Sequence, residues 1–452
     1  MTTFQVRSAP PVLTPVLPPA DARVRQPVRL GLQTAAALLA LAALCVGAIL
    51  GSLSVRSDAA ALRVSVADRA AVAADLRFAL ADLDAQRADQ LVPGHAADDP
   101  GVSVGNRLLA LITAQQRRRE ISAALRQLGS DTTQTDRVRS LLDALGRYDD
   151  AGGRTAYVDE QQPDRAAGHP PAIAVAFSAE AGDIMHNDLL PQATALSRAY
   201  DAQATAAAHT AHTAAVRSLW TVILLGALAL AVLLWWQAEL ARRYRRLLNP
   251  GLALATAAVL AVTLAGAVSF HSAATDLDTS VREGLRPWSR LAEARAVAAD
   301  AAAAQSRWLV TDPGAAAQQR TRFTALTRRL DTLLAPSGYA TPAELPAYAD
   351  VRTRYGHFLA DDRHLRRLIA AGRLDEAAAV LTNVARDNVA FDFWDFATTL
   401  TQLAAQQRSD ATDAASTARS ALDGWPAIPA GVLGASALLV LAGVRPRLAE
   451  YR

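Results

Sequence analysis

Four long apolar runs alternate with polar stretches along this chain. The runs cover Leu30–Leu53, Leu219–Trp236, Gly251–Phe270 and Ala427–Val444. Each is about as long as a helix that crosses the ~30 Å hydrocarbon core of a bilayer. None has an acidic or basic side chain in its interior. The pattern predicts four membrane-spanning helices, at residues 30–53, 218–236, 251–270 and 427–444.

Two large polar segments, residues 54–217 and residues 271–426, lie between these runs. Three short segments complete the chain: a proline-rich tail at 1–29, a loop at 237–250 and a tail at 445–452. The prolines of residues 1–29 are typical of a disordered, extended segment. The predicted order is therefore span, large segment, span, short loop, and then span, large segment and span again.

The short segments carry much of the positive charge. Together they contain eleven arginines and three acidic residues, a net charge of +8, whereas the whole chain is +3 and the remainder is therefore −5. Short basic segments stay in the cytoplasm. We therefore expect a plasma-membrane protein with both termini inside and both large segments outside. In the central loop the expected cytoplasmic anchors are Arg242, Arg243, Arg245 and Arg246.

Composition indicates the type of genome that encodes the chain and bears on whether the chain binds lipid or nucleic acid. All 46 basic residues are arginine and alanine is abundant, which is typical of a high-GC bacterial genome. The positive charge gathers at the inner face of the membrane, where it favours contact with lipid. The total of +3 therefore does not indicate nucleic-acid binding.

The first run has two alternative interpretations. A cleaved signal peptide has a shorter apolar stretch and a small-residue cleavage site, which this run lacks. A lipoprotein signal would place a small residue before the lipidated cysteine, but Leu44 precedes Cys45, the one cysteine of the chain. We therefore favour a retained anchor, with Cys45 in no disulfide within the chain.

Both large segments have the composition and periodicity of helices. Leu76, Leu80 and Leu83 recur on one helical face, and a similar stripe runs from Val389 to Leu403. Breakers such as Gly152-Gly153 divide each segment into about four helices. An up-and-down four-helix bundle packs such helices economically. The predicted fold class is therefore an all-α membrane protein with two extracytoplasmic helical bundles.

The two halves of the chain resemble each other. Pro93-Gly94 lies about as far past the first run as Pro313-Gly314 lies past the third, and the segment around Tyr148 parallels the one around Tyr348. These parallels predict a duplicated unit, in which one bundle is framed by two spans.

Signatures of catalysis are absent from the sequence. It contains no phosphate-binding glycine loop, kinase motif, His-Glu-x-x-His or Gly-x-Ser-x-Gly. His209 and His212 lie three residues apart on a predicted helix, but no third metal ligand is near them in sequence. The acidic and arginine clusters are typical of a solvated, salt-bridged helix surface. We expect no enzyme activity, no cofactor and no metal.

Two features could bind a partner protein. In the aromatic cluster, Phe393 and Phe396 fit the core stripe, whereas Phe391 and Trp394 fall on an adjacent face. The other feature is the polar connection Gly152–Pro171. The candidate partner-binding residues are Gln161, Gln162, Phe177, Tyr348, Phe391 and Trp394. Small residues in the spans, such as Gly47 and Gly51, are compatible with a homodimer.

Four short segments carry a family resemblance. They are Leu80–Asp89, Leu189–Ala193, Trp308–Val310 and Phe391-Asp392. With the four spans, they resemble the actinobacterial four-pass membrane proteins of the GlnX type. The resemblance implies a relay, in which a periplasmic lipoprotein that binds glutamate or aspartate contacts the outer bundles and a cytosolic serine/threonine kinase responds inside. The Gln161–Pro171 stretch departs from the Asn/Arg-rich stretch expected there.

The first functional hypothesis is thus a non-enzymatic transmembrane signal relay. The second is a direct, chemoreceptor-like sensor that binds a small ligand between its own helices, which predicts a pocket with converging arginines. A transporter or channel is disfavoured, because the spans lack the ionisable residues that mark a transport path. An envelope structural protein is a further alternative.

Overall fold

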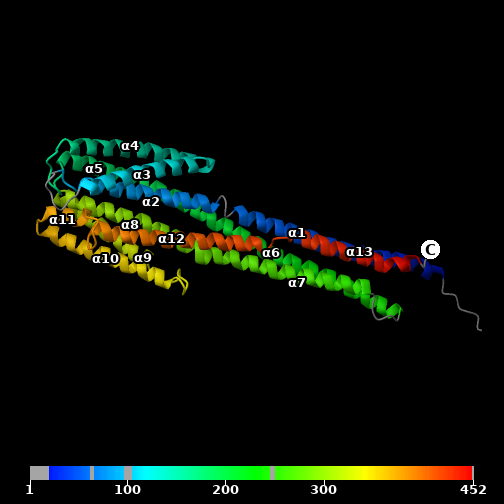
Figure 1. Ribbon diagram of the computed structural model, residues 1–452. Coiled ribbons are helices and arrows are strands. Elements are labelled where there is room, and N and C mark those ends of the chain that lie inside the picture. Colours follow the sequence, from blue (N-terminus) through cyan, green and yellow to red (C-terminus); the bar gives the residue numbers. More distant parts are fainter. Residues whose placement is uncertain (1–19, 62–65, 96–103, 245–249, 450–452) are drawn as a thin grey trace, which may run out of the picture. The chain divides into compact units, whose positions relative to one another are not determined.

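The computed structural model describes residues 20–61, 66–95, 104–244 and 250–449 (Figure 1). These residues are predominantly helical and contain no strand, which confirms the predicted all-helical class. The helices are α1 (Ala20–Ala61), α2 (Ala67–Asp89), α3 (Val104–Leu128), α4 (Thr135–Glu160), α5 (Ala172–Ile184), α6 (Leu190–Tyr244), α7 (Pro250–Thr279), α8 (Arg286–Val310), α9 (Pro313–Leu333), α10 (Leu345–Ala370), α11 (Leu374–Thr382), α12 (Val389–Ser420) and α13 (Ala427–Ala449).

Two compact units divide the chain. The first, here called the apolar unit, comprises Met1–Ser54, Ala215–His271 and Leu422–Arg452. The second, here called the bundle unit, comprises Val55–Ala214 and Ser272–Ala421. Helices of both large polar segments therefore belong to one compact unit.

Three helical stretches are long and apolar enough to cross a membrane. They are Gly31–Ala61, Ala172–Arg242 and Pro250–Val310. The fourth apolar run forms a shorter apolar helix, Ala427–Gly443. The first three predicted runs thus fall in helical stretches of spanning length, and the fourth falls in α13, a helix of 23 residues whose apolar stretch is described as far as Gly443.

Small residues bring the helices of the apolar unit close together. A Cβ added to Gly226 of α6 would lie 2.3 Å from Oγ1 of Thr263 in α7. Gly47 and Gly51 of α1 lie against α6, where their added Cβ atoms would be 2.8 Å from side-chain atoms of Leu225 and Ser218. The pair expected to support a homodimer therefore packs within the chain.

Two π-helical turns interrupt the longest helical paths. One, η3 (Met185–Leu189), joins α5 to α6, and the other, η4 (Ser280–Leu285), joins α7 to α8. Helix α6 has 55 residues, of which those up to Ala214 belong to the bundle unit and the rest to the apolar unit. The same helical backbone thus runs through both units.

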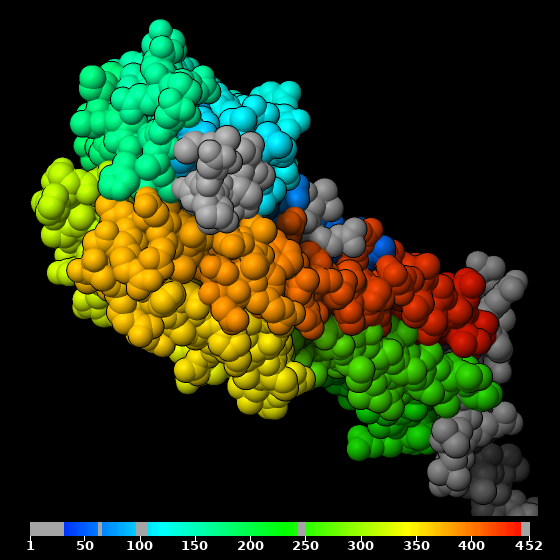
Figure 2. All heavy atoms as spheres, turned by 60° about the vertical axis from the view of Figure 1, so that its left-hand side comes forward, coloured from blue at the N-terminus to red at the C-terminus, as the bar shows by residue number. Residues whose placement is uncertain are grey.

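In the bundle unit, α2 and α8 pack against each other and join the two polar segments. Helix α3 packs on α2, α9 packs on α8, and α12 packs on both α8 and α10. Figure 2 shows the surface of the second segment, in yellow to orange, against that of the first, in cyan to green. The predicted stripe of Leu76, Leu80 and Leu83 is buried in the shared core.

The predicted helix break at Gly152-Gly153 is wrong, because α4 continues through both glycines to Glu160. The connection to α5 is shorter than expected. Gly152 has a packing role: an added Cβ would lie 2.6 Å from Nη1 of Arg87, which donates a hydrogen bond to the Tyr148 carbonyl at 3.3 Å. The glycine therefore admits the arginine instead of ending the helix.

Candidate functional site

A buried ion pair joins the two polar segments at the centre of the bundle unit. Arg307 of α8 donates to Asp84 of α2 through two hydrogen bonds, from Nη1 to Oδ2 at 2.7 Å and from Nη2 to Oδ1 at 2.6 Å. The two side chains are 5% and 1% exposed. A bidentate guanidinium–carboxylate pair of this kind fixes orientation as well as adding energy.

Further polar groups extend this pair into a network, here called the central charge cluster. The Tyr148 hydroxyl of α4 donates to Oδ1 of Asp84 at 3.1 Å. Nε2 of His186, in the π-turn η3, lies 3.8 Å from Oδ2 of Asp84 and 3.1 Å from Oδ1 of Asp300. Arg322 of α9 pairs with Asp300 at 3.0 Å. The cluster therefore links α2, α4, η3, α8 and α9.

Burial and neighbouring charges shift the pKa values of Arg307, Tyr148 and Asp300. Burial opposes the charge on Arg307, but the Asp84 carboxylate more than offsets this and raises the pKa of the guanidinium. Burial raises the pKa of Tyr148 well above its usual value, so the hydroxyl stays a donor. Burial would raise the pKa of Asp300, but the hydrogen bond with His186 and the charge of Arg322 hold it below its ordinary value.

The central charge cluster is closely packed, and we looked in it for metal ligands. Among the described residues, no three His, Cys, Asp or Glu side chains are arranged to hold a metal ion. A Cβ added to Gly182 of α5 would lie 3.1–3.3 Å from guanidinium atoms of Arg307, so the helix packs directly on the ion pair. The close approach of Gly182 to Arg307 specifies how α5 packs against the ion pair.

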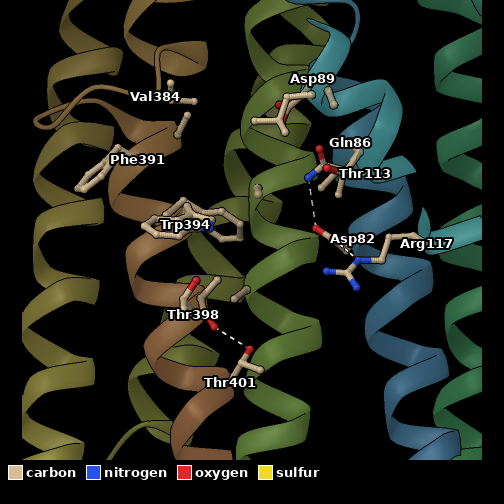
Figure 3. Close-up of a pocket in the computed structure, with 18 of the residues that line it drawn as sticks. Asp82, Gln86, Asp89, Thr113, Arg117, Val384, Phe391, Trp394, Thr398 and Thr401 are labelled. Atoms are coloured by element: carbon tan, nitrogen blue, oxygen red, sulfur yellow. Dashed lines mark hydrogen bonds and ion pairs between the residues drawn. The ribbon is translucent and has the colours of Figure 1, made fainter. Parts of the chain in front are cut away.

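A cavity of about 770 Å³, here called the aromatic cavity, lies in the bundle unit (Figure 3). Its lining comes from α2, α3, α8, α11 and α12, so both polar segments contribute. Asp82, Asp89 and Arg117 lie on one side, and Phe391 and Trp394 lie on the opposite side. The cavity thus combines a polar wall with an aromatic wall.

The arginines of the polar wall already have acidic partners. Nε of Arg117 lies 2.6 Å from Asp82, and its Nη1 lies 2.7 Å from Glu120. Arg295 pairs with Asp75 at 3.0 Å. Both guanidiniums also lie over the ring of Phe78, at 4.9 Å and 4.3 Å from its centroid.

Asp89 differs from these groups, because no described residue forms an ion pair with it. The hydroxyl of Ser306 donates a hydrogen bond to Oδ1 of Asp89. Burial raises the pKa of Asp89 to about 7, against the opposing effect of the Ser306 hydrogen bond, and the charge of Asp82 adds to the increase. The Asp89 carboxyl therefore changes charge near neutral pH.

The structure places the predicted partner-binding residues in different environments. Phe391 and Trp394 line the aromatic cavity with ring centroids 5.9 Å apart, and Trp394 is 60% exposed. Gln161 and Gln162 are exposed just after α4. Tyr348 is buried in the core at 1% exposure, so its side chain is not at the surface.

Phe177 is partly buried, and the Arg154 guanidinium lies 4.6 Å from its ring centroid. Phe391 and Trp394 are thus the pair that shares one site. Of the expected cytoplasmic anchors, Arg242 is exposed near the end of α6 and Arg243 follows it in the same helix. Arg245 and Arg246 lie outside the described residues.

Sequence reasoning missed Asp84, Asp89 and Arg307, since it assigned the charged residues to a solvated surface. A signal was present at Asp84, because this residue directly follows Leu83 of the apolar stripe. Arg307 similarly follows the alanine-rich stretch of α8. A charged residue next to an apolar stripe can be buried along with that stripe, and a buried charged residue is almost always paired with an opposite charge.

A second cavity, of about 760 Å³, bears on direct ligand sensing. It is lined by residues of α2, α3, α4, α5 and α8. Its arginines are Arg87, Arg107, Arg118, Arg119 and Arg307. Four of these five arginines pair with acidic side chains: Arg87 and Arg118 with Asp149, Arg107 with Asp159, and Arg307 with Asp84.

Comparisons with protein-family models, curated proteins and solved structures found no match to this chain. The account of function therefore rests on the sequence pattern and the geometry.

Proposed function

We propose that this protein is a non-enzymatic transmembrane signal relay. In this proposal four apolar helices anchor the chain in the plasma membrane, with both termini and the 237–250 loop in the cytoplasm. The bundle unit lies outside and receives the signal. The resemblance noted above suggests an amino-acid-binding lipoprotein as the outer partner and a serine/threonine kinase as the inner one.

The continuity of α6 is the observation that carries this proposal. Its 55 residues, at a rise of about 1.5 Å each, make one helix that belongs to both units. Because a hydrogen-bonded helix resists stretching, a shift of its bundle end moves its apolar end as well. Small helix shifts of this kind are an established way to transmit signals between sites.

The two π-turns support the same proposal. A π-turn inserts extra backbone into a helix, and such turns are often found at functional sites. His186 of η3 lies between Asp84 and Asp300. In η4, the Ser280 hydroxyl donates to the Ala411 carbonyl of α12 at 2.8 Å. Both turns are thus held by contacts that a rearrangement of the bundle unit would change.

Direct sensing of a small molecule is the second candidate function, and the two cavities favour it. Each has a volume in the range usual for small-ligand sites, and each is lined by apolar surface with a few polar groups. In this alternative the ligand itself would shift the helices of the bundle unit. Helix α6 would transmit this shift as it does in the relay proposal.

The proposed sidedness is tested by labelling single cysteines in intact cells. In a Cys45→Ala background, Ser130→Cys and Ser337→Cys place a thiol at exposed positions of the two polar segments, and Arg242→Cys places one near the end of α6. We expect a membrane-impermeant maleimide to label positions 130 and 337, and to label position 242 only after permeabilisation. Labelling of position 242 alone in intact cells would refute the proposed topology.

A further inference from the structure

We infer that the aromatic cavity binds a small organic cation with an aromatic or apolar body. This inference names a ligand class for the bundle unit. A signalling role for the ligand rests on the proposed relay. The binding itself follows from the lining residues and needs no partner protein.

Ion pairing among the charged residues of the cavity leaves Asp89 as the group that a ligand can neutralise. Its two arginines, Arg117 and Arg295, are paired with Asp82, Glu120 and Asp75. Asp89 adds a carboxyl that no described residue neutralises. The charged residues that line the cavity are Asp82, Asp89, Arg117 and Arg295, and Asp89 is the one of these without an ion-pair partner in the described part of the chain. A cation is therefore attracted and an anion is repelled.

Aromatic rings form the wall opposite Asp89. Phe391, Phe393 and Trp394 line the side contributed by α12, and Trp394 remains 60% exposed. Such rings attract a cation placed over their faces. Phe78 already carries two guanidiniums of the protein, whereas no described arginine lies over Trp394. The indole face is thus open to a ligand.

The carboxyl and the indole ring face the same cavity from different helices. Asp89 and Trp394 lie on opposite sides of the cavity (Figure 3). The remaining lining includes Leu109, Ala298, Ala302, Leu381 and Val384, which are apolar. A ligand that spans the cavity can therefore pair its charged end with Asp89 and stack its apolar body on Trp394.

Three ligands with the same indole ring test this inference: tryptamine, which is cationic, tryptophol, which is neutral, and indole-3-acetate, which is anionic. Binding to the intact protein in nanodiscs is measured by calorimetry at pH 8. We expect tryptamine to bind about tenfold more tightly than tryptophol, the usual value of one charge-assisted contact. Indole-3-acetate is expected to bind more weakly than either.

Point variants locate the binding. Asp89→Asn should reduce tryptamine affinity about tenfold, to that of tryptophol, and leave tryptophol affinity unchanged. Trp394→Ala should reduce the affinity for both tryptamine and tryptophol. The control is Tyr157→Ala, which removes a ring that is 66% exposed on α4 and does not line the cavity. It should leave all affinities unchanged, and thermal unfolding of each variant shows that the fold is retained.

A pH titration gives an independent readout. Because the pKa of Asp89 is raised to about 7, lowering the pH from 8 to 6 should protonate it and weaken tryptamine binding in the wild type. The other charged lining groups are Asp82 on α2, Arg117 on α3 and Arg295 on α8, and α12 contributes none. The pH effect should therefore be absent in Asp89→Asn.

Equal affinity for the three ligands, or tighter binding of indole-3-acetate, would overturn the inference. So would tryptamine binding that Asp89→Asn and Trp394→Ala leave unchanged. These results would not affect the relay proposal, since cysteine labelling tests that proposal separately.

Discussion

Replacing Arg307 with leucine is expected to lower the free energy of unfolding by about 3–5 kcal/mol, the cost of removing one partner of a buried ion pair. The Asp84 carboxylate is 1% exposed in the intact protein, and without Arg307 its remaining polar neighbours among the described residues are the Tyr148 hydroxyl at 3.1 Å and the more distant His186 at 3.8 Å. Thermal unfolding of the intact protein in detergent should show a correspondingly lower midpoint.

Two further variants test whether the unpaired charge causes this loss. The double variant Asp84→Leu with Arg307→Leu removes both charges and should recover much of the stability. Arg139→Leu is the matched control, because Arg139 is 65% exposed and pairs with Asp136, which is 97% exposed. It should change stability by less than about 1 kcal/mol. If Arg307→Leu has an effect no larger than Arg139→Leu, the ion pair does not hold the two segments together.

Gly284→Ala is expected to lower the free energy of unfolding by about 3 kcal/mol, near the upper end of the cost of overpacking. Gly284 lies in the π-turn η4, and its added Cβ would be 2.4 Å from Cβ and 2.6 Å from Cα of Ala411. The obstructing atoms include α12 backbone, so the helix itself must move. The same measurement of thermal unfolding applies.

The control for this substitution is Gly356→Ala, inside α10. Nothing lies within 4 Å of the added Cβ at this position. The alanine should therefore stabilise the protein, by about 0.5–1 kcal/mol, through lower chain entropy in the unfolded state. Opposite signs at the two glycines would confirm the close contact between η4 and α12. A neutral effect of Gly284→Ala would mean that α12 is not locked against the turn.

Helix content followed from the sequence because it depends on local periodicity. The stripe at Leu76, Leu80 and Leu83 and the stripe containing Phe396 and Leu400 are both buried as predicted. These positions repeat every three or four residues, and such a face has to be covered by another helix. Long apolar helices could also be predicted from the sequence, since length and composition define them.

Features that depend on contacts between distant segments did not follow from the sequence. Gly152 was interpreted as a helix break, but it admits Arg87, a residue 65 positions earlier in the chain. The pairing of Asp84 with Arg307 likewise joins two segments whose packing no periodicity reveals. The π-turn η4 likewise packs on a distant segment, because Ser280 and Gly284 contact Ala411 of α12.

The candidate site was predicted in part. The helical spacing placed Phe391 and Trp394 on a face beside the core, and both line the aromatic cavity. The sequence does not single out Asp89, because its burial and its hydrogen bond from Ser306 depend on packing against the other half of the chain. Tyr348 lies in the segment that parallels the one around Tyr148, but its side chain is buried in the core on α10 and does not reach the surface.

The central claim is that the bundle unit passes a signal to a protein on the other side of the membrane. Its most direct test is affinity purification of the tagged, intact protein from detergent-solubilised membranes, with and without added glutamate and aspartate, read by mass spectrometry. An unrelated tagged membrane protein serves as the control bait. The account predicts recovery of a periplasmic binding lipoprotein and a cytosolic kinase, in amounts that change with the amino acid. Recovery of neither protein above the control would contradict it.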